Sequence, residues 1–226
     1  MASEQAPPPA GERDDELVLI DESQPPPRLP IFPLPNVLLF PNMALPLHIF
    51  EERYKRMVND CLQGDRLLGL FLLQRGWEQA GSSPTPYEVG GMGRITRAVK
   101  YPNETMDILL SGLARVRVLR YIQEKPYLIA EVEMWRDEPD DSEGVEALTR
   151  RMVGLFERFV TLKAGEGHEL LTNLKLLSSP IDLLHCVVTN MPLDFHLKQE
   201  IMNLRPIDER VTMMITLLNR ELSGAK

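Results

Sequence analysis

The chain has 226 residues, of which 43% are hydrophobic and 26% are charged, a balance that is ordinary for a folded globular protein. This length allows one sizeable core, or one core with a smaller helical lobe, and leaves little room for two full domains. No apolar run approaches the roughly 18 residues of a membrane-spanning helix, and the N-terminus has neither the basic start nor the apolar stretch of an export signal. We therefore expect a cytoplasmic protein without membrane contact.

The net charge of −8 is concentrated in two segments. Residues 1–28 hold seven acids and two bases, and residues 137–146 hold six acids and no base, so the rest of the chain is close to neutral. Residues 1–28 also contain two Pro-Pro-Pro runs and few bulky apolar groups, a composition that cannot bury enough surface to offset the entropy of ordering. The sequence predicts a disordered, acidic, proline-rich tail over residues 1–28 and an acidic linker that begins at residue 137.

Residues 29–136 are expected to form a β-rich lobe. Prolines at 30, 33, 35, 41 and 46 interrupt short apolar runs, which indicates strands at sheet edges, bends or strand starts, because proline cannot donate to a ladder. After Phe50, apolar residues recur with helical spacing as far as Leu62, and Gly64 is expected to end this helix.

Strands are predicted in the rest of this lobe by near-continuous or alternating apolar segments. They fall near residues 66–74, 87–102, 105–112, 115–118 and 127–135. In the alternating segment Arg115-Val116-Arg117-Val118, the arginines are expected to point outward and the valines inward. Several short strands around one helix, without regular βαβ alternation, favour a closed or nearly closed mixed β-barrel.

Residues 137–226 are expected to be the acidic linker followed by a small α-helical bundle. An apolar stripe at helical spacing runs from Val145 to Leu162. Ser179 and Pro180 fit an N-cap followed by proline at the first helical position, a third helix begins near Asp194, and a fourth runs from about Pro206 to Leu222. The expected fold class is therefore α+β.

Four segments, which carry five motifs in the same order, resemble the N-terminal, substrate-binding domain of Lon proteases. They are LPIFPLPNVLLFPNMALPLHIFEERYKRMV at the start, YEVGGMGRI and LLSGLARVRVL in the strands, and MPLDFHLKQEIMNLRPIDERVTMMITLLNREL in the helical part. The first of these carries both a P-L-x-x-x-L-F-P and a P-L-x-I-F-E-x-R-Y core. The resemblance covers about residues 29–222 and implies a PUA-like β-barrel lobe followed by a helical lobe.

In Lon this domain precedes an AAA+ module and a peptidase, and the motifs of both are missing from this sequence. There is no GxxxxGK[ST] phosphate loop, and no serine stands in the Gly-Pro-Ser context of the Lon Ser-Lys dyad. We therefore expect a free-standing, non-catalytic domain. Peptidase activity that depends on ATP would need another chain.

Chemical motifs elsewhere in the sequence favour structural interpretations, so no catalytic, cofactor-binding or metal-binding residue is predicted. Gly90-Gly91-Met92-Gly93 lacks the third glycine of a dinucleotide motif and fits a strand that approaches another backbone closely. The four histidines, 48, 168, 185 and 196, and the two cysteines, 61 and 186, have no metal-ligand or disulfide spacing. Glu51-Glu52 fits the positive end of a helix dipole.

Six basic residues on neighbouring predicted strands raise a nucleic-acid alternative, because PUA-like barrels include RNA binders. They are Arg94, Arg97, Lys100, Arg115, Arg117 and Arg120. The near-neutral charge of this lobe and the few aromatic residues among these bases favour a solvated strand face instead. We therefore expect no nucleic-acid partner.

Trp77 and Tyr87 are the candidate protein-binding residues. Trp77 stands in a Pro/Gly/Ser-containing loop with Tyr87 close behind it, and aromatic rings in such loops provide contact area at low entropic cost. The expected partners, by resemblance, are unfolded or degradation-prone protein segments, and a protease or ATPase chain. A bound segment would add a strand or lie in an apolar groove.

Overall fold

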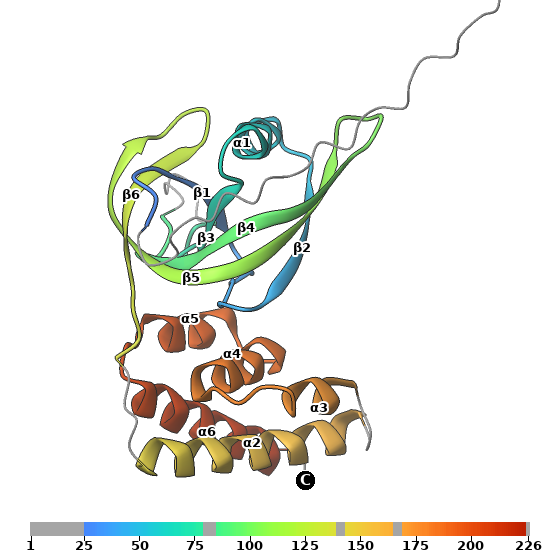
Figure 1. The fold of residues 1–226 in the computed structure, drawn as a ribbon, viewed down its shortest axis with the longest axis vertical. Coiled ribbons are helices and arrows are strands. Elements are labelled where there is room, and N and C mark those ends of the chain that lie inside the picture. Colours follow the sequence, from blue (N-terminus) through green and yellow to red (C-terminus); the bar gives the residue numbers. More distant parts are fainter. Residues whose placement is uncertain (1–24, 79–84, 139–142, 165–168, 225–226) are drawn as a thin grey trace, which may run out of the picture.

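A computed structural model describes residues 25–78, 85–138, 143–164 and 169–224 of the chain (Figure 1). The strands are β1 Leu29–Leu34, β2 Ala44–Ile49, β3 Leu67–Leu72, β4 Val89–Lys100, β5 Met106–Gln123 and β6 Leu128–Met134. The helices are α1 Glu52–Gln63, α2 Glu143–Ala164, α3 Glu169–Leu174, α4 Pro180–Asn190, α5 Phe195–Asn203 and α6 Ile207–Ser223. The α+β class is confirmed. Most of the expected tail, the middle of the loop after Trp77 and part of the acidic linker lie outside the described residues.

The strands form one mixed sheet whose pairings close into a ring. The order β5-β4-β3-β1-β6 returns to β5, because β5 and β6 also pair with each other, and β1 and β3 are the parallel neighbours. Two strands that the sequence had suggested separately are one, β5, of 18 residues. Its length follows from its pairing, since one edge carries β2 along Met106–Ser111 and then β6 along residues 116–123.

β1 lies inside the sheet although it contains two prolines, so the expectation of an edge strand is wrong for this segment. Its ladder to β6 covers Leu29 to Ile31, and its ladder to β3 covers Ile31 to Leu34. The Leu34 carbonyl accepts from Leu73 N at 2.9 Å, on the β3 side. The backbone N–H positions of successive residues point to alternate sides of the strand. Pro30 faces β3, at a point where the β1–β3 ladder has not yet begun, and Pro33 faces β6, where the β1–β6 ladder has already ended. The missing N–H groups therefore cost no ladder bond.

The glycines of β4 and β5 let a separate backbone segment cross the sheet at close range. A Cβ added to Gly91 would lie 1.9 Å from the carbonyl oxygen of Leu39, and one added to Gly112 would lie 2.1 Å from that of Phe40. The predicted close approach of two backbones is confirmed. It replaces any nucleotide-binding interpretation of this glycine-rich strand.

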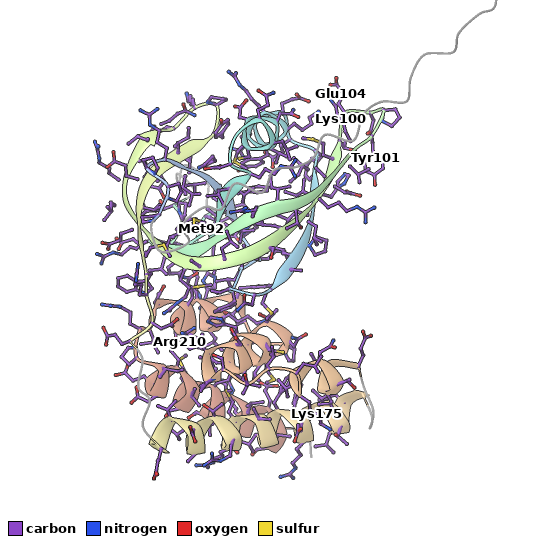
Figure 2. All side chains as sticks on the ribbon, viewed as in Figure 1. Met92, Lys100, Tyr101, Glu104, Lys175 and Arg210 are labelled. Carbon is purple, nitrogen blue, oxygen red and sulfur yellow. The ribbon has the colours of Figure 1, made fainter. Side chains whose placement is uncertain are left out.

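α1 forms as the spacing predicts and covers one end of the ring (Figure 1). Its apolar face, Tyr54, Met57, Val58 and Cys61, is buried against residues of the sheet. Met92, which Figure 2 labels, belongs to the core inside the ring with Ile31, Phe71 and Val116. Both cysteines are buried and free, as expected.

The helices pack below the sheet, with α5 and α4 nearest to it and α2 and α6 farther away (Figure 1). α4 begins at Pro180 after Ser179, and α5 begins after Asp194, whose carboxylate accepts from His196 N at 2.9 Å. The short helix α3 was not predicted from the sequence. Among the described residues, no helix has both the length and the apolar character needed to cross a bilayer.

The helical part and the sheet share one core at their junction. Phe40 and Val89, from the sheet side, belong to the same buried cluster as the helical core. The Gln199 side-chain amide on α5 donates to Val89 O at 2.9 Å, and Trp135 Nε1 donates to Asn203 O at 2.9 Å. Trp135 therefore packs between the two parts.

Candidate functional site

Trp77 lies at a groove on the β-rich part of the molecule. A cavity of about 380 Å³ opens between the end of β1, the start of α1, the end of β3 and the turn that joins β5 to β6. We call it the Trp77 groove. Its lining residues are mainly apolar or aromatic: Pro33, Leu34, Pro35, Tyr54, Leu73, Trp77, Pro126, Tyr127 and Leu128, with Glu51, Arg53 and Glu124 as the charged members.

Tyr54 is held in the wall of the groove by two ring contacts. Its ring centroid lies 4.3 Å from that of Phe32, and the Arg53 guanidinium carbon lies 4.5 Å above its ring. Arg53 Nε in turn donates to Glu51 at 3.0 Å, just before α1 begins. Helical spacing had placed Tyr54 on the buried face of α1, but spacing alone could not reveal that its ring also lines a groove.

Tyr127 joins the groove to α1 through its hydroxyl group. The hydroxyl donates to Asp60 Oδ2 at 2.6 Å. Burial raises the pKa of Tyr127, and the hydrogen bond to Asp60 raises it further, so the hydroxyl remains a neutral donor at physiological pH. The aromatic wall is thus fixed on both sides, by Phe32 behind Tyr54 and by Asp60 beneath Tyr127.

Three prolines give the groove a rigid apolar surface. Pro33 and Pro35 follow one another at the end of β1, and Pro126 stands in the turn before β6. Proline has a fixed φ and no N–H group, so these positions offer contact area without donors. Grooves lined by aromatic rings accept extended segments in several peptide-recognition domains. In the sequence, prolines in this region had indicated only strand edges, bends or strand starts.

Tyr87 does not line the groove. Its hydroxyl lies 3.0 Å from His196 Nδ1, and the two ring centroids are 5.8 Å apart, so Tyr87 joins the sheet to α5. The structure therefore places the two candidate residues in different surroundings, Trp77 at a groove and Tyr87 at the junction. A role in binding stays a prediction for both.

The six basic residues do not form one free basic face. Arg117 donates to Glu133 at 2.6 Å, and Arg120 donates to Glu131 at 2.7 Å. Arg115 points away from the core inside the ring, as alternation predicts, but only 3% of its surface is exposed, so it is not part of a solvated face. Acids of the chain neutralise these three positions, which removes much of the charge that a phosphate backbone would meet.

Arg115 is buried because the helical part covers this face of β5. Its guanidinium donates to the carbonyls of Met202 and Leu204 at 2.6 Å each and to Asp137 Oδ1 at 2.6 Å. Arg210 on α6, labelled in Figure 2, pairs with the same Asp137 oxygen. We call Arg115, Asp137, Arg210 and His185 the junction cluster, since Arg210 Nη2 also lies 2.8 Å from His185 Nε2.

The junction cluster was not predicted from the sequence. One signal was available, because Arg210 lies three residues after Ile207 and four before Met214, on the apolar stripe of α6. Burial lowers the pKa of His185 well below its usual range, and the two arginines lower it further, so this imidazole is neutral. The cluster is a structural ion-pair network between the two parts of the molecule.

The remaining chemical motifs have structural partners. His48 Nδ1, on β2, lies 2.6 Å from Asp107 on the paired strand β5, and both side chains are exposed. Glu51 stands at the N-cap of α1 and Glu52 in its first turn, as the helix-dipole interpretation predicts. In the described ranges, no group of three or more His, Cys, Asp or Glu residues is arranged to hold a metal ion.

The α+β architecture is that of Lon N-terminal domains. The structure is similar to the N-terminal domain of a Mycobacterium avium complex Lon protease, with a TM-score of 0.70 and 14% identity over 85% of this chain and 98% of that one. It is also similar to a Lon N-terminal domain protein from Xanthomonas campestris, with a TM-score of 0.61 and 22% identity over 84% of this chain and 97% of that one.

Residues 28–220 match the ATP-dependent protease La (LON) substrate-binding domain, and the chain belongs to this family. Relatives include the Lon protease of Dictyoglomus thermophilum, 31% identical over 86% of this chain, and that of Brevibacillus choshinensis, 28% identical over 85%. The chain spans about a quarter of the length of these relatives, 24% and 25%. The match is to the substrate-binding domain, and the protease and ATPase domains are not part of it.

Proposed function

We propose that the chain is a non-catalytic binding domain that holds apolar segments of unfolded proteins in the Trp77 groove. The observation that carries this proposal is the groove itself, with its aromatic and proline lining and only three charged members. Its cavity of about 380 Å³ has room for one or two bulky side chains of a bound segment. The family to which the chain belongs supports a protein ligand.

The chemistry of the lining favours a particular kind of segment. Trp77, Tyr54 and Tyr127 offer ring faces, and the prolines beside them offer no N–H donor, so most of the affinity must come from buried apolar surface. Folded proteins keep such side chains inside, whereas unfolded chains expose them. The groove therefore selects unfolded proteins because their apolar side chains are exposed, and no particular sequence motif is needed.

The biological setting is part of the same proposal. The bound segments are degradation substrates, and a protease or ATPase acts on them in the cytoplasm. The domain itself hydrolyses neither ATP nor protein, since the sequence lacks the phosphate loop and the Lon serine motif. Its contribution is recognition, and therefore proteolysis or protein quality control is the process in which it takes part.

The test uses Trp77 as its own reporter. In a Trp135→Phe variant, Trp77 is the one remaining tryptophan, so its emission reports on the groove alone. Titration with reduced, carboxymethylated ribonuclease A, a chain that stays unfolded and contains no tryptophan, should shift this emission to shorter wavelength. The Trp77→Ala exchange in the wild-type chain should weaken binding about tenfold, measured with labelled, carboxymethylated ribonuclease A.

The matched control is Leu119→Ala, which removes an exposed apolar side chain from β5, outside the groove lining. This variant should bind as the wild-type chain does. Equal loss of affinity in Trp77→Ala and Leu119→Ala would mean that nonspecific hydrophobic association, and not the groove, holds the unfolded chain. Unchanged Trp77 emission at saturating, carboxymethylated ribonuclease A would refute the proposed site.

A further inference from the structure

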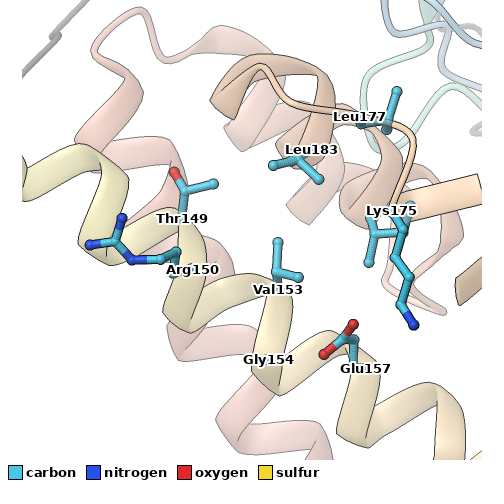
Figure 3. Close-up of a pocket in the computed structure, with 9 residues that line it drawn as sticks. Thr149, Arg150, Val153, Gly154, Glu157, Lys175, Leu177 and Leu183 are labelled. Atoms are coloured by element: carbon cyan, nitrogen blue, oxygen red, sulfur yellow. The ribbon is translucent and has the colours of Figure 1, made fainter.

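A second cavity lies in the helical part, far from Trp77 in the chain and built from other elements. It has a volume of about 290 Å³ and opens between α2 and the segment that runs from the end of α3 into α4 (Figure 3). Its apolar lining consists of Val153 on α2 with Leu174, Leu177 and Leu183 on the other side. We call it the α2 pocket.

Gly154 leaves one side of the α2 pocket without a side chain. This residue is in the middle of α2, where glycine costs about 1 kcal/mol of helix stability relative to alanine. A Cβ added at Gly154 would meet nothing within 4 Å, so no packing contact within the described chain requires glycine there. The missing side chain lets the backbone of a bound segment approach the surface of α2.

A polar group without a partner also lines the α2 pocket. The Oγ1 atom of Thr149 is buried and has no hydrogen-bond partner among the described residues. Buried hydroxyl groups are normally paired, and an unpaired one costs free energy. Thr149 lines the α2 pocket, so this unpaired hydroxyl belongs to the wall that a bound segment would contact.

The rim of the α2 pocket carries an excess of positive charge. Arg150 lies at one end in Figure 3, and Lys175 and Glu157 lie at the other. The contact of Arg150 with Glu146 is 3.4 Å long and exposed, so it holds Arg150 only weakly. Next to Lys175, Leu176 has 79% of its surface exposed and extends the apolar area beyond the rim.

We propose that the α2 pocket docks a short segment of a partner protein in which a bulky aliphatic side chain is flanked by acidic residues. The aliphatic side chain fills the space between Val153 and Leu183. The flanking carboxylates pair with Arg150 and Lys175, one at each end. This docking site is separate from the Trp77 groove and selects by charge as well as by apolar surface.

Three labelled synthetic peptides test the proposal by fluorescence anisotropy with the full chain. The first has three leucines between two Asp-Glu pairs, the second replaces the acids with lysines, and the third replaces the leucines with serines. The acidic leucine peptide should bind at least about tenfold more tightly than either of the others, because each of them lacks one of the two recognition elements. Equal affinity of the acidic and basic leucine peptides would overturn the proposal, as would no binding of the acidic one up to about 1 mM.

Variants then locate the site. Gly154→Phe fills the pocket and should weaken the acidic leucine peptide about tenfold, and Gly154→Ala, which adds only one methyl group, should weaken it less. Lys175→Glu, an exposed change that leaves the core intact, should weaken it similarly. Its matched control is Arg151→Glu, which is also exposed but does not line the pocket. Trp77→Ala should have no effect. If Lys175→Glu and Arg151→Glu weaken the peptide equally, the peptide responds to net charge and the site is wrong.

Discussion

Arg115 on β5 and Arg210 on α6 donate to the same atom, Oδ1 of Asp137. Both arginine side chains are almost fully buried, and Asp137 stands where the chain leaves β6 for the helical part. Burial lowers the pKa of Arg210, and the neighbouring Arg115 lowers it further, so the charged form depends on the one carboxylate that they share. The junction between sheet and helices is therefore organised around a single acidic residue.

Removal of this carboxylate should destabilise the whole protein. The Asp137→Asn exchange keeps the size of the side chain but leaves two buried guanidinium groups without a counter-charge, and such a change costs about 3–5 kcal/mol. The measurement is the free energy of unfolding from urea denaturation at pH 7. Glu131→Gln is the control, because its partner Arg120 is exposed, and the loss of stability should be much smaller than for Asp137→Asn. A similar decrease in the free energy of unfolding in both variants would show that the buried junction cluster contributes no more to stability than an exposed ion pair does.

His185 should make the protein sensitive to mild acid. Burial depresses its pKa in the folded state, so the imidazole gains a proton only after unfolding, where its pKa is about 6.5. The unfolded state then binds more protons, and stability falls as the pH drops below about 6.5, by about 1.4 kcal/mol per pH unit. Urea denaturation between pH 5 and pH 7.5 measures this slope. His185→Gln removes the titrating group, and its slope should be smaller; an unchanged slope would assign the acid sensitivity to other groups.

Much of the fold could be predicted because the periodicity of the sequence reflects local burial. The helical spacing of Tyr54, Met57, Val58 and Cys61 predicted α1, and all four are buried. The run Leu67–Leu72 predicted a strand with both faces covered, and every residue of β3 is buried. In these elements the apolar residues report directly which surfaces leave water.

The candidate sites were harder to predict, because they depend on which elements meet. Alternation along β5 correctly put Val116 inside, but it could not show that helices cover the opposite face and bury Arg115 as well. The Trp77 groove combines residues from β1, α1 and the β5–β6 turn, which are separated by up to about 90 positions. The loop tryptophan gave a signal in the sequence, whereas its proline and tyrosine neighbours required the tertiary structure.

The same substitution at two glycines should have opposite effects. Gly91→Ala places a methyl group 1.9 Å from the Leu39 carbonyl oxygen, so two backbones must separate and stability should fall by about 3 kcal/mol or more. Gly154→Ala meets nothing within 4 Å in the middle of α2 and should raise stability by up to about 1 kcal/mol. Thermal unfolding of both variants beside the wild-type chain tests the pair. A destabilised Gly154→Ala variant would mean that α2 needs glycine at this position for a reason other than space.

Cys61 and Cys186 should resist thiol reagents as long as the protein is folded. Burial raises the pKa of Cys61 to about 12 and also raises that of Cys186, so the reactive thiolate is scarce at pH 8. The disulfide reagent DTNB should therefore modify neither thiol at pH 8 in buffer and both in 8 M urea. The same shift predicts that stability declines above about pH 9, because the unfolded thiol of Cys61 loses its proton there while the folded one keeps it. Cys61→Ala and Cys186→Ala identify which thiol reacts if either does, and rapid modification of Cys61 in the folded chain would show that α1 separates from the sheet without global unfolding.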